Sequence, residues 1–208
     1  MDIINWKKII HSSLHSRAQD ALDNCDFLAF ICYASNEFSL PLLASVANQA
    51  LACGKLELAF VNAFIATRTS NRQHSETIRY LLQLLDPLEL KKQGNKIPLQ
   101  KEFRLYRGSS RINSFAKIKG YSWTRNLELA HWYAMRHPEL GCPFIFTTTV
   151  SEDSILFYTN ERDEDEFVLD PKNVNAILLE YGDQKIADKY QNYINYENQA
   201  AYKRDASA

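Results

Sequence analysis

Two glutamates at the end of an acidic run are the residues in this sequence best suited to chemistry. The run Glu161–Glu166 holds five acids in six residues and leads directly into an apolar segment typical of a strand. If the strand includes the glutamates, alternation puts Glu164 and Glu166 on one face, about 7 Å apart, with Phe167 and Leu169 on the other. Two carboxylates held side by side on a rigid strand suit chemistry at a sugar carbon. For this segment alone, a solvated acidic loop is the simpler interpretation.

Two other segments carry polar groups suited to ligand binding. Arg107 ends a β-prone run and precedes Gly108, so its planar guanidinium can be aimed into a cleft, where it suits a phosphate. Ser122 and Thr124 lie just before a predicted helix, and in an extended chain their hydroxyls point to the same side. Thr124 is also a candidate helix cap. Taken singly, these segments fit a surface arginine beside a turn and an ordinary cap equally well.

The elements that must position these groups differ between the two halves of the chain. Residues 1–90 show apolar residues at helical spacing, and Gly54 and Pro87 are expected to end helices. The predicted helices cover residues 3–22, 27–34, 40–53, 57–66 and 75–85, the last capped by Ser75. The polar stretch Lys91–Lys96 is the expected boundary.

Short β-prone runs follow this boundary, with one helix among them. The predicted strands cover residues 103–106, 120–123, 144–150, 155–158, 167–169 and 174–181. A helix over 125–136 should end before Pro138, and the tail from Gln184 is either a helix or a packed extension. The sequence therefore predicts an α+β protein, with a helical lobe at residues 1–98 and a mostly β lobe at 99–208.

Composition narrows the class of protein. The chain has 24 basic and 25 acidic residues and a net charge of −1, so it lacks the basic excess typical of a protein that coats a nucleic-acid duplex. The four cysteines, which have no metal-ligand spacing, are expected to be buried and unpaired in a reducing compartment; they are Cys25, Cys32, Cys53 and Cys142. No uninterrupted apolar segment predicts a Sec signal or a membrane span. We expect a cytoplasmic protein, or one delivered to a target cell's cytoplasm by another route, without a metal.

Taken together and in order, the three segments resemble the Arg–Ser–Glu class of ADP-ribosyltransferases. That family has a strand-borne arginine, an S-T-S-like triplet and an E-x-E pair, matched here by Arg107, by Ser122-Trp123-Thr124 and by Glu164-Asp165-Glu166. The central residue of the triplet departs from the family pattern, while both hydroxyl positions remain. The interval from Ser122 to Glu166 leaves room for the helix and two strands that the family fold places there. The resemblance does not extend to the N-terminal lobe.

The resemblance implies NAD as a substrate and a role for each matched residue. Arg107, with Gly108 beside it, would bind NAD phosphate, and Ser122, supported by Thr124, would orient the catalytic glutamate. Glu166 would bind the ribose 2′-OH as the nicotinamide bond breaks, because a fixed carboxylate favours the positive charge that develops on the ribose. Glu164 would orient or deprotonate the acceptor. In the family, a glutamate at that position commonly accompanies arginine acceptors, which need an anionic partner.

Three further positions match the family more loosely. Tyr133 and Arg136 lie where the family often places an aromatic residue and a second arginine that contact NAD, although a helix-face tyrosine and a cation at a helix end are equally plausible. Tyr158 precedes the E-x-E pair, where the family's acceptor-recognition loop lies, and is either an acceptor contact or a satisfied tyrosine at a strand end. The histidines, including His131, fit core or capping positions better than ligand positions.

Three functions remain open from the sequence. The first is mono-ADP-ribosylation of a protein side chain, with arginine as the expected acceptor; since the family includes many bacterial toxins and effectors, the resemblance also implies toxicity and an antitoxin or immunity protein as partner. The second keeps the chemistry but transfers ADP-ribose to a base of RNA or DNA, which a small aromatic single-strand site can bind. The third is a non-catalytic interaction module with a solvated acidic run.

Overall fold

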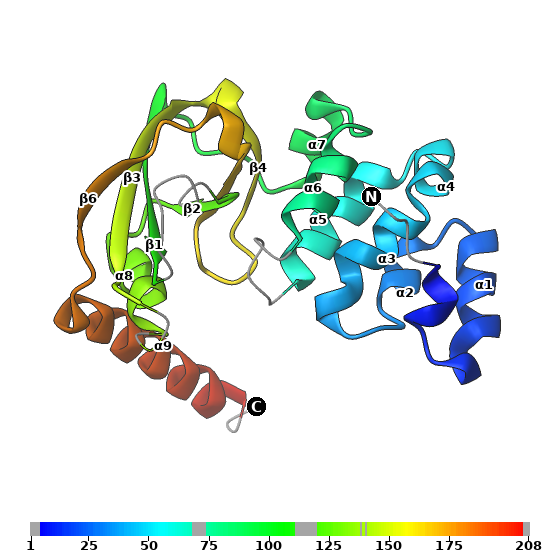
Figure 1. Ribbon diagram of the computed structural model, residues 1–208. Helices are drawn as coiled ribbons and strands as arrows, with labels where there is room; N and C mark the ends of the chain where they lie inside the picture. Colours follow the sequence, from blue (N-terminus) through cyan, green and yellow to red (C-terminus); the bar gives the residue numbers. More distant parts are fainter. Residues whose placement is uncertain (1–4, 68–73, 111–119, 138, 140, 206–208) are drawn as a thin grey trace. The chain divides into compact units, whose positions relative to one another are not determined.

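The chain folds as two compact units, Met1–Gly94 and Asn95–Ala208. The computed structural model describes residues 5–67, 74–110, 120–137, 139 and 141–205 (Figure 1). Side chains are described as far as residue 195. The division between the units falls inside the polar stretch Lys91–Lys96. The predicted α+β class is confirmed, because N-terminal helices precede a six-stranded antiparallel sheet that is accompanied by two helices.

Short helices packed on one another make up the N-terminal unit. Helix α3 packs against α5, and both contribute fully buried leucine and phenylalanine side chains, including Leu40 and Phe60. The helices are α1 (His15–Asp23), α2 (Phe27–Ile31), α3 (Ser39–Ser45), α4 (Ala47–Ala52), α5 (Leu56–Ala66), α6 (Ser75–Leu82) and α7 (Pro87–Gln93).

Several predicted helix boundaries are wrong, each for a local reason. The stretch predicted as one helix over 40–53 is two helices, because Val46 leaves the helical region and buries its β-branched side chain. Pro87 begins α7 instead of ending the previous helix, since a missing N–H costs nothing in a first turn and the Asp86 side chain accepts hydrogen bonds from the N–H groups of Leu88 and Glu89. Ser75 is the first residue of α6 and not its cap. Gly54 does follow the end of α4, with φ of +62°.

The prediction of four buried, unpaired cysteines is also wrong. Cys25 and Cys53 form a disulfide with a Cα–Cα distance of 6.3 Å, and Cys32 and Cys142 are exposed. Cys25 follows α1 in a left-handed conformation with φ of 55°, and Cys53 is the C-cap residue directly after α4. The disulfide joins the ends of α1 and α4, which are separated in sequence, so no cysteine spacing motif predicts it.

The C-terminal unit is built on one antiparallel sheet with the strand order β4-β5-β2-β1-β3-β6. The strands are β1 (Glu102–Ser109), β2 (Ser122–Thr124), β3 (Phe144–Ser151), β4 (Ile155–Thr159), β5 (Glu166–Leu169) and β6 (Ile177–Tyr181). Each lies within or overlaps a predicted β-prone run. Helix α8 (Leu127–Met135) separates β2 from β3, and the undecided tail forms helix α9 (Gln184–Asp205). Pro138, expected to end α8, lies outside the described residues, as does most of the segment between β1 and β2.

The sheet buries apolar side chains on both faces. One cluster combines residues from five strands, among them Phe103, Trp123 and Phe167. The smaller cluster on the other face contains Ala130 and Ala134 of α8, which packs against β1, and α9 packs in turn on α8 (Figure 1). The short strand β2 is therefore fixed at the centre of the sheet between β1 and β5.

His131 fastens α8 to the end of the sheet. Its ring is fully buried; Nδ1 accepts a hydrogen bond from the backbone N–H of Asp183 at 2.9 Å. Because Nδ1 accepts, Nε2 carries the proton and faces a carboxylate oxygen of Glu180 at 3.2 Å. The expected role of His131 as a core histidine is confirmed.

Candidate active site

Three neighbouring strands bring together the arginine, serine and glutamate singled out in the sequence. Arg107 is on β1, Ser122 on β2 and Glu166 on β5, and β2 lies between the other two strands. Thr124 pairs directly with Glu166, and Ser122 pairs with Val168. Because paired residues of adjacent strands share a face, both hydroxyls and the Glu166 carboxylate lie on the same face of the sheet.

Glu166 is a buried carboxylate with defined partners. The residue is only 6% exposed, and its side chain accepts a hydrogen bond from the Ser122 hydroxyl. One oxygen also contacts Nη2 of Arg162 at 3.3 Å. Burial raises the pKa of Glu166 above its ordinary value, while the Ser122 hydrogen bond and the Arg162 charge act in the opposite direction. Ser122 and Arg162 therefore hold the Glu166 carboxylate in place, and the pKa of this carboxylate depends on both partners as well as on burial.

Glu164 approaches Glu166 by a different route from the predicted one. Strand β5 begins at Glu166, and both Asp163 and Asp165 have left-handed φ values, 54° and 48°. The chain turns there, so the two glutamates are not alternate residues of one strand, and that prediction is wrong. They nevertheless meet, because Nη2 of Arg162 lies 3.1 Å from a Glu164 oxygen and 3.3 Å from a Glu166 oxygen.

Thr124 and Tyr133 hold Glu164 in place. The Thr124 hydroxyl donates a hydrogen bond to the Glu164 carbonyl at 2.8 Å and accepts one from the Asn126 N–H at 3.0 Å. Asn126 itself is the residue that caps α8, through the N–H of Leu129. The Tyr133 side chain, on α8, hydrogen-bonds Glu164; burial and the charge of that carboxylate raise the Tyr133 pKa. Thr124 and Tyr133 therefore lie at the site, and Thr124 is not the helix cap.

Arg107 has a hydrogen-bonding group still to satisfy. Its Nη1 donates to the Ser122 carbonyl at 2.7 Å, whereas its Nε is buried without a hydrogen-bond partner among the described residues. Burial lowers the Arg107 pKa, and the charge of Glu166 opposes this effect. A buried N–H without a partner costs about 1–3 kcal/mol. A phosphate oxygen would satisfy this N–H and balance the buried charge, so Arg107 fits the role of an anion ligand.

Two glycines of this region leave space for neighbouring groups, and Gly108 is the one predicted to lie beside the NAD phosphate. A Cβ at Gly108 would lie 1.8 Å from the carbonyl oxygen of Ala130, so glycine there allows β1 and α8 to approach. Gly108 therefore has a packing role, and its predicted place beside the NAD phosphate stays a prediction. A Cβ at Gly120 would lie 2.2 Å from the guanidinium carbon of Arg107. Gly120 therefore provides the space that the Arg107 guanidinium occupies.

The described contacts of Arg136 and Tyr158 are with residues other than Arg107, Ser122, Glu164 and Glu166. The exposed Arg136 guanidinium stacks 5.1 Å from the centre of the Trp132 ring at the end of α8. Tyr158 is buried, with its ring 4.7 Å from Phe167 and its hydroxyl donating to Asp165 at 2.7 Å. The structure thus favours the structural interpretation of both residues.

Sequence reasoning missed the side chains that organise the acidic loop. Arg125 binds both oxygens of Asp165 at 2.6 and 2.8 Å, and Tyr158 binds the same carboxylate. These contacts fix the end of the loop just before Glu166. Arg162 was missed as well, although a single basic residue inside an acidic run is a signal that it pairs locally.

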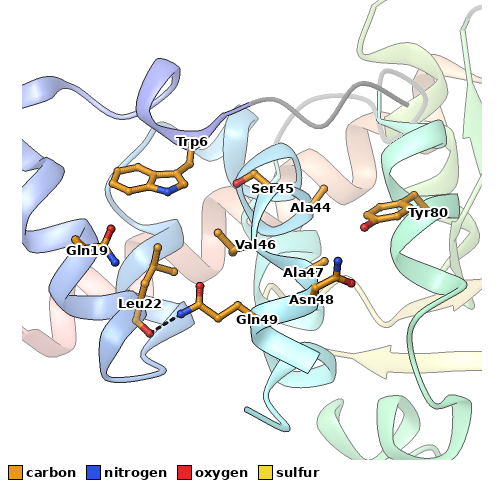
Figure 2. A pocket seen from close by; sticks show the side chains of 10 residues that line it. All are labelled: Trp6, Gln19, Leu22, Ala44, Ser45, Val46, Ala47, Asn48, Gln49 and Tyr80. Carbon is orange, nitrogen blue, oxygen red and sulfur yellow. Dashed lines mark hydrogen bonds between the residues drawn. The ribbon is translucent and has the colours of Figure 1, made fainter. Parts of the chain in front are cut away.

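A separate pocket lies within the N-terminal unit. It has a volume of about 360 Å³, and on one side the Gln49 side chain donates a hydrogen bond to the Leu22 carbonyl at 3.0 Å (Figure 2). Its lining residues are Trp6, Gln19, Leu22, Ala44, Ser45, Val46, Ala47, Asn48, Gln49 and Tyr80. The lining carries no charged side chain, and none of the residues predicted to do chemistry lies there.

Among the described residues, no group of three or more histidine, cysteine or acidic side chains is placed to hold a metal ion. Within the same residues, no helix is long and apolar enough to cross a membrane. Comparison with protein-family models, with curated proteins and with solved structures finds no match for this chain.

Proposed function

We propose that this protein is an NAD-dependent mono-ADP-ribosyltransferase that transfers ADP-ribose to a macromolecule, with a protein arginine as the acceptor. The observation that carries the proposal is the meeting of Arg107, Ser122 and Glu166 on three neighbouring strands. The resemblance to the Arg–Ser–Glu class requires these three side chains to act together. Their sequence order alone does not demand that β2 lie between β1 and β5.

Arg107 is suited to binding the NAD phosphates. Its guanidinium is held by the Ser122 carbonyl and retains a buried N–H for which the described residues offer no acceptor. A guanidinium that is oriented before the substrate arrives loses little side-chain freedom on binding. Arg107 would therefore contribute both charge complementarity and the orientation of the substrate.

Glu166 is suited to stabilising the sugar as the nicotinamide bond breaks. The bond from C1′ to the nicotinamide nitrogen breaks with its electron pair moving onto the ring, which leaves positive charge on the ribose. A carboxylate fixed by Ser122 and bound to the ribose 2′-OH favours that charge more in the transition state than in the ground state. This role requires Glu166 in its ionised form; burial raises its pKa and works against that form, while Ser122 and Arg162 favour it.

Glu164 supports the choice of arginine as acceptor. Its carboxylate lies close enough to Glu166 for one guanidinium nitrogen to contact both. An acceptor guanidinium placed there can lose a proton to Glu164 while its nitrogen approaches the sugar carbon beside Glu166. A neutral nucleic-acid base makes less use of a second carboxylate at this position.

Labelled NAD supplied with a cell lysate tests the proposal. Wild-type protein, Glu166→Gln and Glu161→Gln are compared, because Glu161 is an exposed acid of the same loop and serves as the matched control. We expect wild type and Glu161→Gln to label the lysate, and Glu166→Gln to be slower by about 10²–10³-fold. Label that protease removes supports a protein acceptor.

The other outcomes change or remove the proposal. Label that only nuclease removes would keep the enzyme class and make the acceptor a nucleic-acid base. If NAD stays intact with wild type in several lysates, the enzyme assignment fails and the protein is better described as an interaction module.

A further inference from the structure

Arg162 occupies a position between the two glutamates of the site. Its Nη2 lies 3.1 Å from an oxygen of Glu164 and 3.3 Å from an oxygen of Glu166. Burial works against the Arg162 charge, but the two carboxylates more than offset it and raise the Arg162 pKa. The side chain is 40% exposed, so the guanidinium reaches the glutamates from the edge of the site and not from the core.

The other arginines near the site are bound to groups other than the two glutamates. Arg107 donates to the Ser122 carbonyl, and Arg125 is paired with both oxygens of Asp165. Among the ion pairs of the described residues, Arg162 alone contacts both Glu164 and Glu166. One nitrogen of this guanidinium therefore lies where the proposed transfer requires an acceptor nitrogen.

We propose that Arg162 is an internal acceptor, so that the protein attaches one ADP-ribose to its own Arg162. This inference rests on the proposed function. It follows from position, since the acceptor nitrogen must reach the ribose carbon held beside Glu166 while Glu164 takes its proton. Arg162 already lies within hydrogen-bond distance of both carboxylates.

The step balances without a further reagent. The bond from C1′ of the ribose to nicotinamide breaks, and its electron pair neutralises the nicotinamide ring. A lone pair on Nη of Arg162 forms the new bond to C1′, and the guanidinium nitrogen gives up one proton to Glu164, which passes it to water. The products are nicotinamide, the ADP-ribosylated chain and one proton.

The loop that carries Arg162 is held close to the two glutamates. Arg125 and Tyr158 both bind Asp165, which fixes the chain three residues after Arg162. A tethered acceptor has a high effective concentration at the site, so the reaction proceeds without any target protein. Its rate per chain is then independent of protein concentration.

The modification also has a consequence for the site. ADP-ribose adds two phosphate groups beside Glu164 and Glu166, and like charges at this distance repel. The loop carrying Arg162 is then expected to leave the glutamates. Self-modification would therefore open the position that Arg162 fills.

The test uses the purified full-length protein and NAD with no other protein present. Nicotinamide release is followed beside the intact mass, and peptide mapping by electron-transfer fragmentation locates any added ADP-ribose. We expect a mass gain of one ADP-ribose, located at Arg162, in a fraction of chains that is unchanged by dilution. Arg162→Lys should lose this label, whereas Arg104→Lys, a matched change at an exposed arginine of β1, should keep it.

Each remaining result decides between the inference and the proposed function. Nicotinamide release without label on Arg162 of the wild-type chain overturns the inference and leaves the proposed function standing. Label appearing on Arg162 of Glu166→Gln when it is mixed with wild type overturns the internal transfer, because that chain cannot modify itself. The absence of both nicotinamide release and label defeats the two together.

Discussion

Replacing Gly120 by alanine should lower activity strongly while leaving the fold intact. A Cβ at this position would lie 2.2 Å from the guanidinium carbon of Arg107 and 2.6 Å from its Nε. Gly120 is not among the glycines with positive φ, so alanine can adopt its backbone conformation. The added methyl group therefore acts through the Arg107 side chain.

The size of the effect follows from the displacement. Ordinary contacts of a Cβ begin at 3.4 Å, so the guanidinium must move by more than an ångström. It is the far end of a flexible side chain and can move at little cost to stability, but it then loses its alignment with Ser122. A misplacement of about 1 Å in a positioning group costs about 10²-fold in rate. We therefore expect kcat/KM for nicotinamide release to fall by about 10²-fold.

Gly108→Ala provides the contrasting control. Its Cβ would lie 1.8 Å from a backbone carbonyl of α8, which cannot move without shifting the helix. Overpacking of this kind costs about 1–3 kcal/mol of folding free energy, or several degrees in the melting temperature of a unit of this size. Thermal denaturation and initial rates of nicotinamide release, measured on both variants, separate the two effects.

Two results would refute this reasoning. If Gly120→Ala keeps wild-type kcat/KM with an unchanged melting temperature, the position of the Arg107 guanidinium does not matter to the reaction. If Gly120→Ala instead unfolds as readily as Gly108→Ala, the glycine is required by the fold and not by the site.

Three further predictions concern the carboxylates and the disulfide. Glu166→Gln should melt at a higher temperature than wild type at neutral pH, because burial raises the folded-state pKa of Glu166 and so makes the ionised carboxylate destabilising. The difference in melting temperature should shrink as pH falls toward the ordinary pKa of 4.5, and a difference that stays constant across pH would contradict this prediction. Tyr158→Phe should lose about 1 kcal/mol of stability with the hydrogen bond to Asp165, yet keep its rate of acceptor labelling, and a loss of labelling with nicotinamide release intact would restore Tyr158 as an acceptor contact. Cys25→Ser should lower the free energy of unfolding of the N-terminal unit by about 3.6 kcal/mol in denaturant titrations, because the bond to Cys53 closes a separation of 28 residues. Reductant should lower the stability of wild type only.

Local sequence was enough to predict the elements that carry the candidate site. The β-prone runs around Arg107, Ser122 and Glu166 are strands, and the helix expected after Thr124 is α8. These predictions succeeded because strand and helix formation depend mainly on residue type and on the periodicity of apolar residues. The α+β class followed from the same signals.

Helix ends were harder to predict because they depend on a few backbone groups. Pro87 begins α7 because Asp86 precedes it and caps the first turn, a combination that the rule of proline as a helix breaker overlooks. The break at Val46 depends on the burial of its side chain, which periodicity within one helix does not reveal.

The pairing of distant side chains was decided by the tertiary structure. Cys25 meets Cys53 only because two helix ends come together. The Tyr158 hydroxyl can be buried because it donates a hydrogen bond to the Asp165 carboxylate.

For the candidate site as well, some features depend on the sequence alone and others on the tertiary structure. The sequence by itself determined which residue types stand on which strands, Arg107, Ser122 and Glu166 among them. Only the tertiary structure decided that Glu164 reaches Glu166 through a turn and that Arg162 lies against both. The physical reason is that two left-handed residues redirect the chain before β5, and strand alternation carries no information about a side chain once the strand has ended.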